Sequence, residues 1–198
     1  MEGGREVATV EGNINFSNAR FAEIADRANA QNLRFQEFSP ESKGKIAQAL
    51  QVIPEKFRPS LESSPFNLQA TLITPKENDG KPRKIGLIFL SGTFGTGLGV
   101  GHASADLYRK FEDEGIGFSL SIGSQVSADT VDSNFSNSNA KSATEKAAMI
   151  VEVLKSHPVE DLYFVGHSLA GMDMVATAAL VDKLREIEGM DETKIKGI

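Results

Sequence analysis

One short segment of the sequence has the residue types and spacing of a serine nucleophile on a tight turn. The segment, here named the elbow segment, reads Gly166-His167-Ser168-Leu169-Ala170-Gly171. It matches the pattern G-x-S-x-G with alanine at the last small position, and in that pattern a sharp strand-to-helix turn exposes the serine hydroxyl. Strand and helix pass closely there, so the positions two before and two after Ser168 need very small residues, which Gly166 and Ala170 supply. We therefore predict that Ser168 is a catalytic nucleophile.

The elements around the elbow segment alternate between strands and helices. Apolar periodicity and start and stop signals predict strands over 66–72, 85–90, 117–122 and 161–165, and from 194 onward. They predict helices over 103–114, from a capping box at Ser142–Glu145, and over 169–188, with a polar loop over 123–141. This alternation predicts an α/β fold, a mostly parallel sheet with flanking helices.

The first 60 residues show helical rather than strand periodicity. Ser17 can cap a helix whose apolar positions are Phe21, Ile24, Ala25 and Ala28. A second helix starts at Ser39-Pro40-Glu41 and stops before Pro54. We expect residues 1–60 to be a helical segment, either packing on the sheet or capping a substrate site, and residues 61–198 to be the core.

Composition excludes several classes of site. The sequence has 21 basic and 27 acidic residues, a net charge of −6, no cysteine and three histidines. We expect no nucleic-acid partner, no metal site and no cofactor. The glycine-rich stretch 92–101 lacks the Lys-Ser/Thr ending of a phosphate loop. With a polar N-terminus and no long apolar run, we expect no signal peptide or transmembrane segment, and a soluble, by default cytoplasmic, protein.

Residues 66–198 resemble the α/β-hydrolase superfamily, in particular its lipases and esterases. The resemblance is carried by the elbow segment and by the order of strands and helices. The resemblance implies hydrolysis of a small-molecule or lipid ester through Ser168. It also implies two backbone N–H donors for an oxyanion hole, one from Leu169 and one from Thr93 or Phe94. Those last two residues lie in Ser91-Gly92-Thr93-Phe94-Gly95, where Ser91 stands in place of a histidine often found in the family.

The catalytic partners that the resemblance implies are missing downstream. In the family an acid and a histidine follow the nucleophile, but the histidines here are His102, His157 and His167, none of them after Ser168. His167 sits beside the nucleophile and is expected to point away from it, His157 is expected at a helix end, and His102 as base would invert the family's order. Three later acidic residues are expected to be solvated charges: Asp173, Asp182 and Asp191.

Two interpretations stay open at this point. In the first, the sequence is the N-terminal part of a serine esterase, truncated after the elbow helix, and a C-terminal remainder or a second chain completes the sheet and the triad. The strand beginning at Lys194 would then be an exposed sheet edge, which invites pairing or aggregation. In the second, the chain is a catalytically inert binding or regulatory module, or an inactive fragment, that retains the elbow segment.

Overall fold

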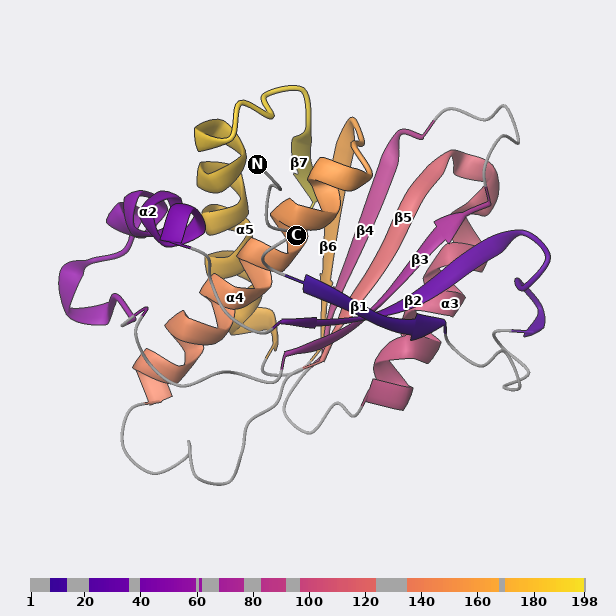
Figure 1. Ribbon diagram of the computed structural model, residues 1–198, viewed down its shortest axis with the longest axis horizontal. Coiled ribbons are helices and arrows are strands. Elements are labelled where there is room, and N and C mark those ends of the chain that lie inside the picture. Colours follow the sequence, from indigo (N-terminus) through magenta and orange to yellow (C-terminus); the bar gives the residue numbers. More distant parts are fainter. Residues whose placement is uncertain are drawn as a thin grey trace.

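A single β-sheet with helices on both faces forms the centre of the molecule. The computed structural model describes residues 8–13, 22–35, 40–59, 61, 68–76, 83–91, 97–123, 135–167 and 170–197. In these residues the sheet has seven strands in the order β1-β2-β3-β5-β4-β6-β7 (Figure 1). No helix in the described ranges is long and apolar enough to cross a membrane.

The strands and helices have the following bounds. The strands are β1 Ala8–Asn13, β2 Ala28–Phe35, β3 Gln69–Pro75, β4 Ile85–Leu90, β5 Ile116–Ile122, β6 Asp161–Gly166 and β7 Lys194–Gly197. The α-helices are α2 Pro40–Ala49, α3 Gly97–Phe111, α4 Phe135–Ser156 and α5 Ala170–Ile187. Short 3₁₀ turns are η1 Leu50–Val52, η2 Glu55–Phe57 and η3 Glu112–Glu114.

Most of the described sheet runs in one direction. Strands β5, β4, β6 and β7 are parallel to one another. Strand β3 is antiparallel to β5, and β2 is antiparallel to β3, so β2 runs with the four parallel strands and five of the seven share one direction. The predicted fold class, a mostly parallel sheet with flanking helices, is confirmed.

The two faces of the sheet carry separate apolar cores. On one face α3 packs through Ala105 and Tyr108 against Ile73 of β3 and Leu87 of β4. The other face holds the larger core, which α2, α4 and α5 cover (Figure 1). Helix α4 is buried on every side from Ala143 to Val151, although its sequence there includes two charged residues. The central strands are buried on both faces, as parallel strands between helix layers should be.

Within this sheet, Gly86 of β4 marks a place of very close packing. A Cβ at this position would lie 2.7 Å from Cζ of Phe118 and 2.8 Å from Cδ1 of Leu162. The aromatic ring of the β5 residue therefore occupies the space that a side chain at 86 would need. This explains the single glycine in an otherwise continuous apolar strand.

The prediction of a helix near residue 17 is wrong for its described part. Residues 23–27 form a turn and β2 begins at Ala28, while β1 lies over residues 8–13. Ala28 and Ala30 face the α3 core and Leu33 faces the opposite core, so the strand does alternate. Its buried positions are mostly alanine, which carries little strand signal, and pairing with β3 decides the structure. The predicted division at residue 60 stays a prediction.

Two helix boundaries also differ from those expected. Helix α4 begins at Phe135, so Ser142–Glu145 lies inside the helix and is not a capping box. Helix α3 begins at Gly97 rather than at residue 103. Strand β3 is buried on both faces, with Thr71 and Leu72 both nearly inaccessible, because α3 packs against one of these faces.

Candidate functional site

The strand order places the ends of β4 and β6 at a topological switch point. These two strands are neighbours, and Leu90, the last residue of β4, is the register partner of Gly166, the last residue of β6. From β4 the chain continues to α3 on one face, and from β6 it continues to α5 on the other face. Open α/β sheets bind ligands at such a divergence, beyond the carboxyl ends of the strands, and we call this place the candidate crevice.

Backbone hydrogen bonds hold three strand ends together at this crevice. The N–H of His167 donates to the carbonyl oxygen of Leu90 at 3.1 Å. The N–H of Ser91 donates to the carbonyl oxygen of Ile122, the last residue of β5, also at 3.1 Å. The Ser91 hydroxyl donates to that same oxygen at 3.3 Å and is buried. Ser91, which stands where the resemblance implies a histidine, thus links the end of β4 to the end of β5.

The chain passes from β6 to α5 through a very short turn. Strand β6 ends at Gly166, α5 begins at Ala170, and the N–H of Ala170 donates to the carbonyl oxygen of His167 at 3.2 Å. A strand and a helix therefore flank residues 167–169 at the carboxyl edge of the sheet, in the order that the elbow pattern requires. The predicted nucleophile and oxyanion donors, Ser168, Leu169, Thr93 and Phe94, lie outside the described residues, and their roles stay predictions.

The space around each small residue of the elbow segment shows whether a larger side chain would fit at that position. A Cβ at Gly166 would lie 2.9 Å from Sδ of Met174 and 3.4 Å from the carbonyl carbon of Ala170. Ala170 is itself buried, with 2% of its surface exposed. A Cβ at Gly171 would meet no atom within 4 Å. The close approach of strand and helix therefore restricts positions 166 and 170, and position 171 is open.

The three histidines lie at different ends of the parallel strands, one at the amino ends and two at or after the carboxyl ends. His157 follows the end of α4, and α4 leads into the amino end of β6, so this residue lies at the edge opposite Gly166. Burial lowers the pKa of the His157 imidazole. His167 directly follows β6 and is exposed, and His102 lies in the first half of α3, the helix that follows β4. Only His102 and His167 belong to elements that start from the candidate crevice.

Asp173 was expected to be a solvated charge, and this is wrong. Its carboxylate accepts a hydrogen bond from Nζ of Lys146 at 2.8 Å, and the lysine side chain is 0% exposed while that of the aspartate is 12% exposed. Asp182 is half exposed and pairs with Arg185 one turn along α5. Asp191 is exposed. Only Asp173 is enclosed by the fold near the start of α5.

Glu145 is a second buried acid that sequence reasoning missed. Its residue is 2% exposed, and its Oε2 has no hydrogen-bond partner among the described residues. Burial raises the pKa of this carboxyl from 4.5 to about 8, against the opposing effect of Lys141 and Lys146. The sequence signal, a Glu-Lys pair inside an apolar helical stretch, was assigned instead to a helix start.

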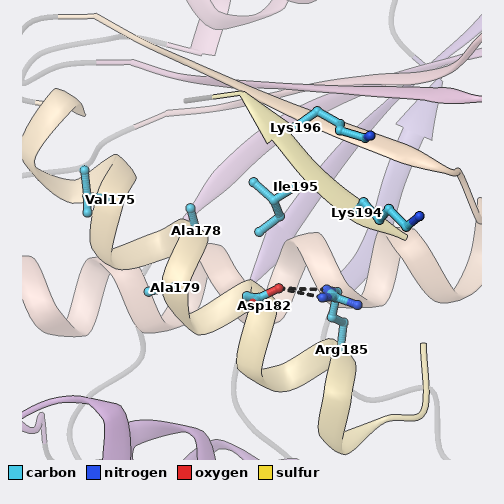
Figure 2. Close-up of a pocket in the computed structure, with 8 residues that line it drawn as sticks. All are labelled: Val175, Ala178, Ala179, Asp182, Arg185, Lys194, Ile195 and Lys196. Atoms are coloured by element: carbon cyan, nitrogen blue, oxygen red, sulfur yellow. Dashed lines mark hydrogen bonds and ion pairs between the residues drawn. The ribbon is translucent and has the colours of Figure 1, made fainter. Parts of the chain in front are cut away.

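A shallow groove lies elsewhere, between α5 and β7 (Figure 2). Its residues are Val175, Ala178, Ala179, Asp182, Arg185, Lys194, Ile195 and Lys196. On the β7 side, Lys194 and Ile195 pair with Asp161 and Leu162 at the amino end of β6, the end away from Gly166. None of the predicted site residues lines this groove, so it is separate from the crevice at β4 and β6.

Comparison with known proteins leaves the sequence without a family assignment but identifies similar folds. No family model matches the chain, and no curated protein matches it. An acetyl xylan esterase from Paenibacillus sp. R4 is similar in structure, with a TM-score of 0.54 and 12% identity, covering 91% of this chain and 52% of that one. A candidate acetyl xylan esterase from Bacteroides fragilis NCTC 9343 gives a TM-score of 0.51 and 10% identity, covering 89% of this chain and 46% of that one.

A third solved structure is less similar: the peroxisomal α/β-hydrolase Lpx1 from Saccharomyces cerevisiae, with a TM-score of 0.45, 15% identity, and coverage of 80% of this chain and 42% of that one. The chain spans about half the length of the two better-matching structures. At these identities the likeness concerns the fold. The chain has an α/β-hydrolase-like fold.

Proposed function

We propose that the protein is a serine hydrolase that acts on carboxylic esters, with Ser168 as its nucleophile. The observation that carries this proposal is the pairing of Leu90 with Gly166 at the switch point. It places the ends of β4 and β6 side by side at one edge of the sheet, and these are the strands after which the segment with Thr93 and Phe94 and the segment with Ser168 follow in the sequence. The names of the two better-matching structures, both acetyl xylan esterases, support a carboxylic ester as the substrate class.

In the proposed reaction the Ser168 oxygen attacks the ester carbonyl carbon and its proton passes to a general base. The carbonyl oxygen becomes negatively charged and accepts hydrogen bonds from the Leu169 N–H and from that of Thr93 or Phe94. Loss of one such donor typically costs about 3 kcal/mol of transition-state stabilisation. The tetrahedral intermediate then collapses, the alcohol leaves with a proton, and water hydrolyses the acyl-serine.

The general base and the acid that orients it are implied by the resemblance, and we assign neither role to a residue of this sequence. An α/β-hydrolase nucleophile is followed by an acid and a histidine, and residues 169–198 contain no histidine. In this proposal both groups are supplied by polypeptide outside residues 1–198, in a continuation of the chain or in a second chain. A base is needed because a serine hydroxyl is a weak nucleophile until its proton is removed.

The lack of a downstream histidine favours one other candidate function, an inert binding or regulatory module. An esterase assay on the complete protein separates this candidate from the first. Ester hydrolysis by the complete protein, lost on Ser168→Ala, would exclude an inert module.

Covalent labelling by a fluorophosphonate probe tests the serine hydrolase proposal directly. The complete protein should be labelled at Ser168, as peptide mapping by mass spectrometry would show. Ser168→Ala should abolish labelling, and Ser156→Ala, a substitution at the end of α4, should leave it unchanged. A folded complete protein that the probe does not label at Ser168 would refute the proposal.

A further inference from the structure

Two ion pairs connect α4 to the two ends of α5. Lys146 donates to Asp173, in the first turn of α5, at 2.8 Å. Lys155 donates to Glu188, just after the end of α5, at 3.0 Å. The acidic partners are 15 positions apart in the sequence (173 to 188), which is about 22 Å along a helix. The two pairs therefore fix opposite ends of the same helix.

The two pairs differ sharply in burial. The side chain of Lys146 is 0% exposed, whereas that of Lys155 is 36% exposed. Lysine is almost never fully buried unless it is paired. A buried pair is weak evidence for stability, because desolvation offsets the attraction, but its directional hydrogen bond can specify one packing geometry. The pair at the start of α5 is thus the one expected to set the position of the helix.

The start of α5 is also where the proposed chemistry lies. Asp173 is five positions after Ser168, and its neighbour Met174 is the residue that a side chain at Gly166 would collide with. In the proposed function the Leu169 N–H acts on the substrate, and this requires that the start of α5 keep its distance from β6. A shift of about 1 Å in such groups can reduce a rate by two orders of magnitude.

We propose that Lys146 is a positioning residue: through Asp173 it fixes the first turn of α5 against β6 and so places Ser168 and the Leu169 N–H for reaction. This inference rests on the proposed function for the identity of the reacting groups. The contact itself is independent of that function. An effect on the transition state alone lowers kcat and leaves KM unchanged.

The test compares Lys146→Met, Asp173→Asn and their double variant with Lys155→Met, which removes the exposed pair on the same two elements. For each folded variant of the complete protein, fluorophosphonate labelling rates and the kcat and KM for a p-nitrophenyl ester are measured. Lys146→Met should lower the labelling rate and kcat about tenfold or more, with KM changed less than about twofold. The double variant should be no slower than the slower single variant, because both remove one interaction.

A second measurement, amide hydrogen exchange, separates failure of the inference from failure of the proposed function. Lys146→Met should speed exchange in peptides covering residues 166–174, and Lys155→Met should not. If the wild-type protein is not labelled but this local change appears, the proposed function is overturned and the positioning of the turn stands. If Lys146→Met is labelled and exchanges its amide hydrogens at the same rates as the wild-type protein, the inference is overturned and the proposed function is left intact. Should Lys146→Met not fold, Asp173→Asn decides, because it removes the charge of the carboxylate while it keeps the size and shape of the side chain, and the same slower labelling and faster exchange are expected.

Discussion

The position that a Cβ would take at Gly166 lies 2.9 Å from Sδ of Met174. Glycine at 166 is explained by lack of space rather than by backbone conformation, since its φ is not in the left-handed region. The Met174 side chain of α5 thus occupies the space beside the end of β6. It is the part of the elbow argument that can be tested without any assay of activity.

We expect Gly166→Ala to lower the free energy of unfolding by about 1 kcal/mol, the low end of the usual cost of overpacking, because the atom in its way belongs to the end of a flexible methionine side chain. Met174→Ala should reduce that cost when combined with it, because it removes the atoms that the new methyl group meets. Urea denaturation of the two single variants and the double variant measures the coupling. Gly171→Ala is the control: nothing lies within 4 Å of its Cβ position, so its stability should be unchanged or slightly higher. Equal effects at positions 166 and 171 would contradict this account.

The buried pair Lys146–Asp173 gives a prediction about stability that is separate from catalysis. Lys146→Met leaves the Asp173 carboxylate buried without its partner, at a cost of about 3–5 kcal/mol. Lys155→Met should cost less than about 1 kcal/mol, because its pair is partly exposed. Replacing both buried partners, Lys146→Met with Asp173→Leu, should recover most of the loss. Thermal or urea unfolding measures all three, and a double variant as unstable as Lys146→Met would be inconsistent with a lone buried charge as the cause.

The buried carboxyl of Glu145 should make the folded state less stable as the pH rises. Because burial raises its folded pKa from 4.5 to about 8, the folded state binds more protons than the unfolded state between these values. Its contribution to stability is therefore full below about pH 4.5 and is lost as the pH rises to about 8. Glu145→Gln should flatten this slope and be a few kcal/mol more stable than wild type at pH 9.

Unfolding free energies measured in urea at pH 5, 7 and 9 test this prediction. Glu152→Gln, on the same helix with its side chain 33% exposed, is the matched control and should keep the wild-type slope. If Glu145→Gln and wild type show parallel pH profiles, the buried carboxyl is not the group responsible.

The lysines of strand β7 are expected to limit the association of one copy of the chain with another. In the described sheet it pairs with β6 alone, and its exposed residues Lys194 and Lys196 flank the half-buried Ile195. Lysines on an edge strand discourage pairing with another chain. The double substitution Lys194→Val and Lys196→Val should increase the apparent mass seen by light scattering as concentration rises. Replacing Lys110 and Lys183, which lie on helices, should not, and an unchanged mass for the β7 variant would refute this role.

The sequence predicted the elements best where periodicity and local signals agree. Strand β4 was predicted to the residue, and α2 begins at Pro40 as its start signal indicates. Strand β2 was missed because Ala28 and Ala30 carry a burial pattern without β-branched or aromatic side chains. Partners far apart in sequence decide such a strand, and a single segment does not report them.

For the candidate site, the sequence located the elbow segment, and the structure added its surroundings. The switch point depends on β5 lying beside β4 on one side and β6 on the other, which no local pattern encodes. The pair between Lys146 and Asp173 joins residues 27 positions apart on two helices. Each residue alone looks like an ordinary surface charge, and only packing of α4 against α5 shows otherwise.

The strand order has a consequence for synthesis on the ribosome. Strands β3 and β4 are consecutive in the chain, yet β5 lies between them in the sheet. The antiparallel unit of β1, β2 and β3 therefore gains its link to the remaining strands only after residues 116–122 have left the exit tunnel. Until then the side of β3 that later pairs with β5 presents backbone N–H and carbonyl groups without strand partners.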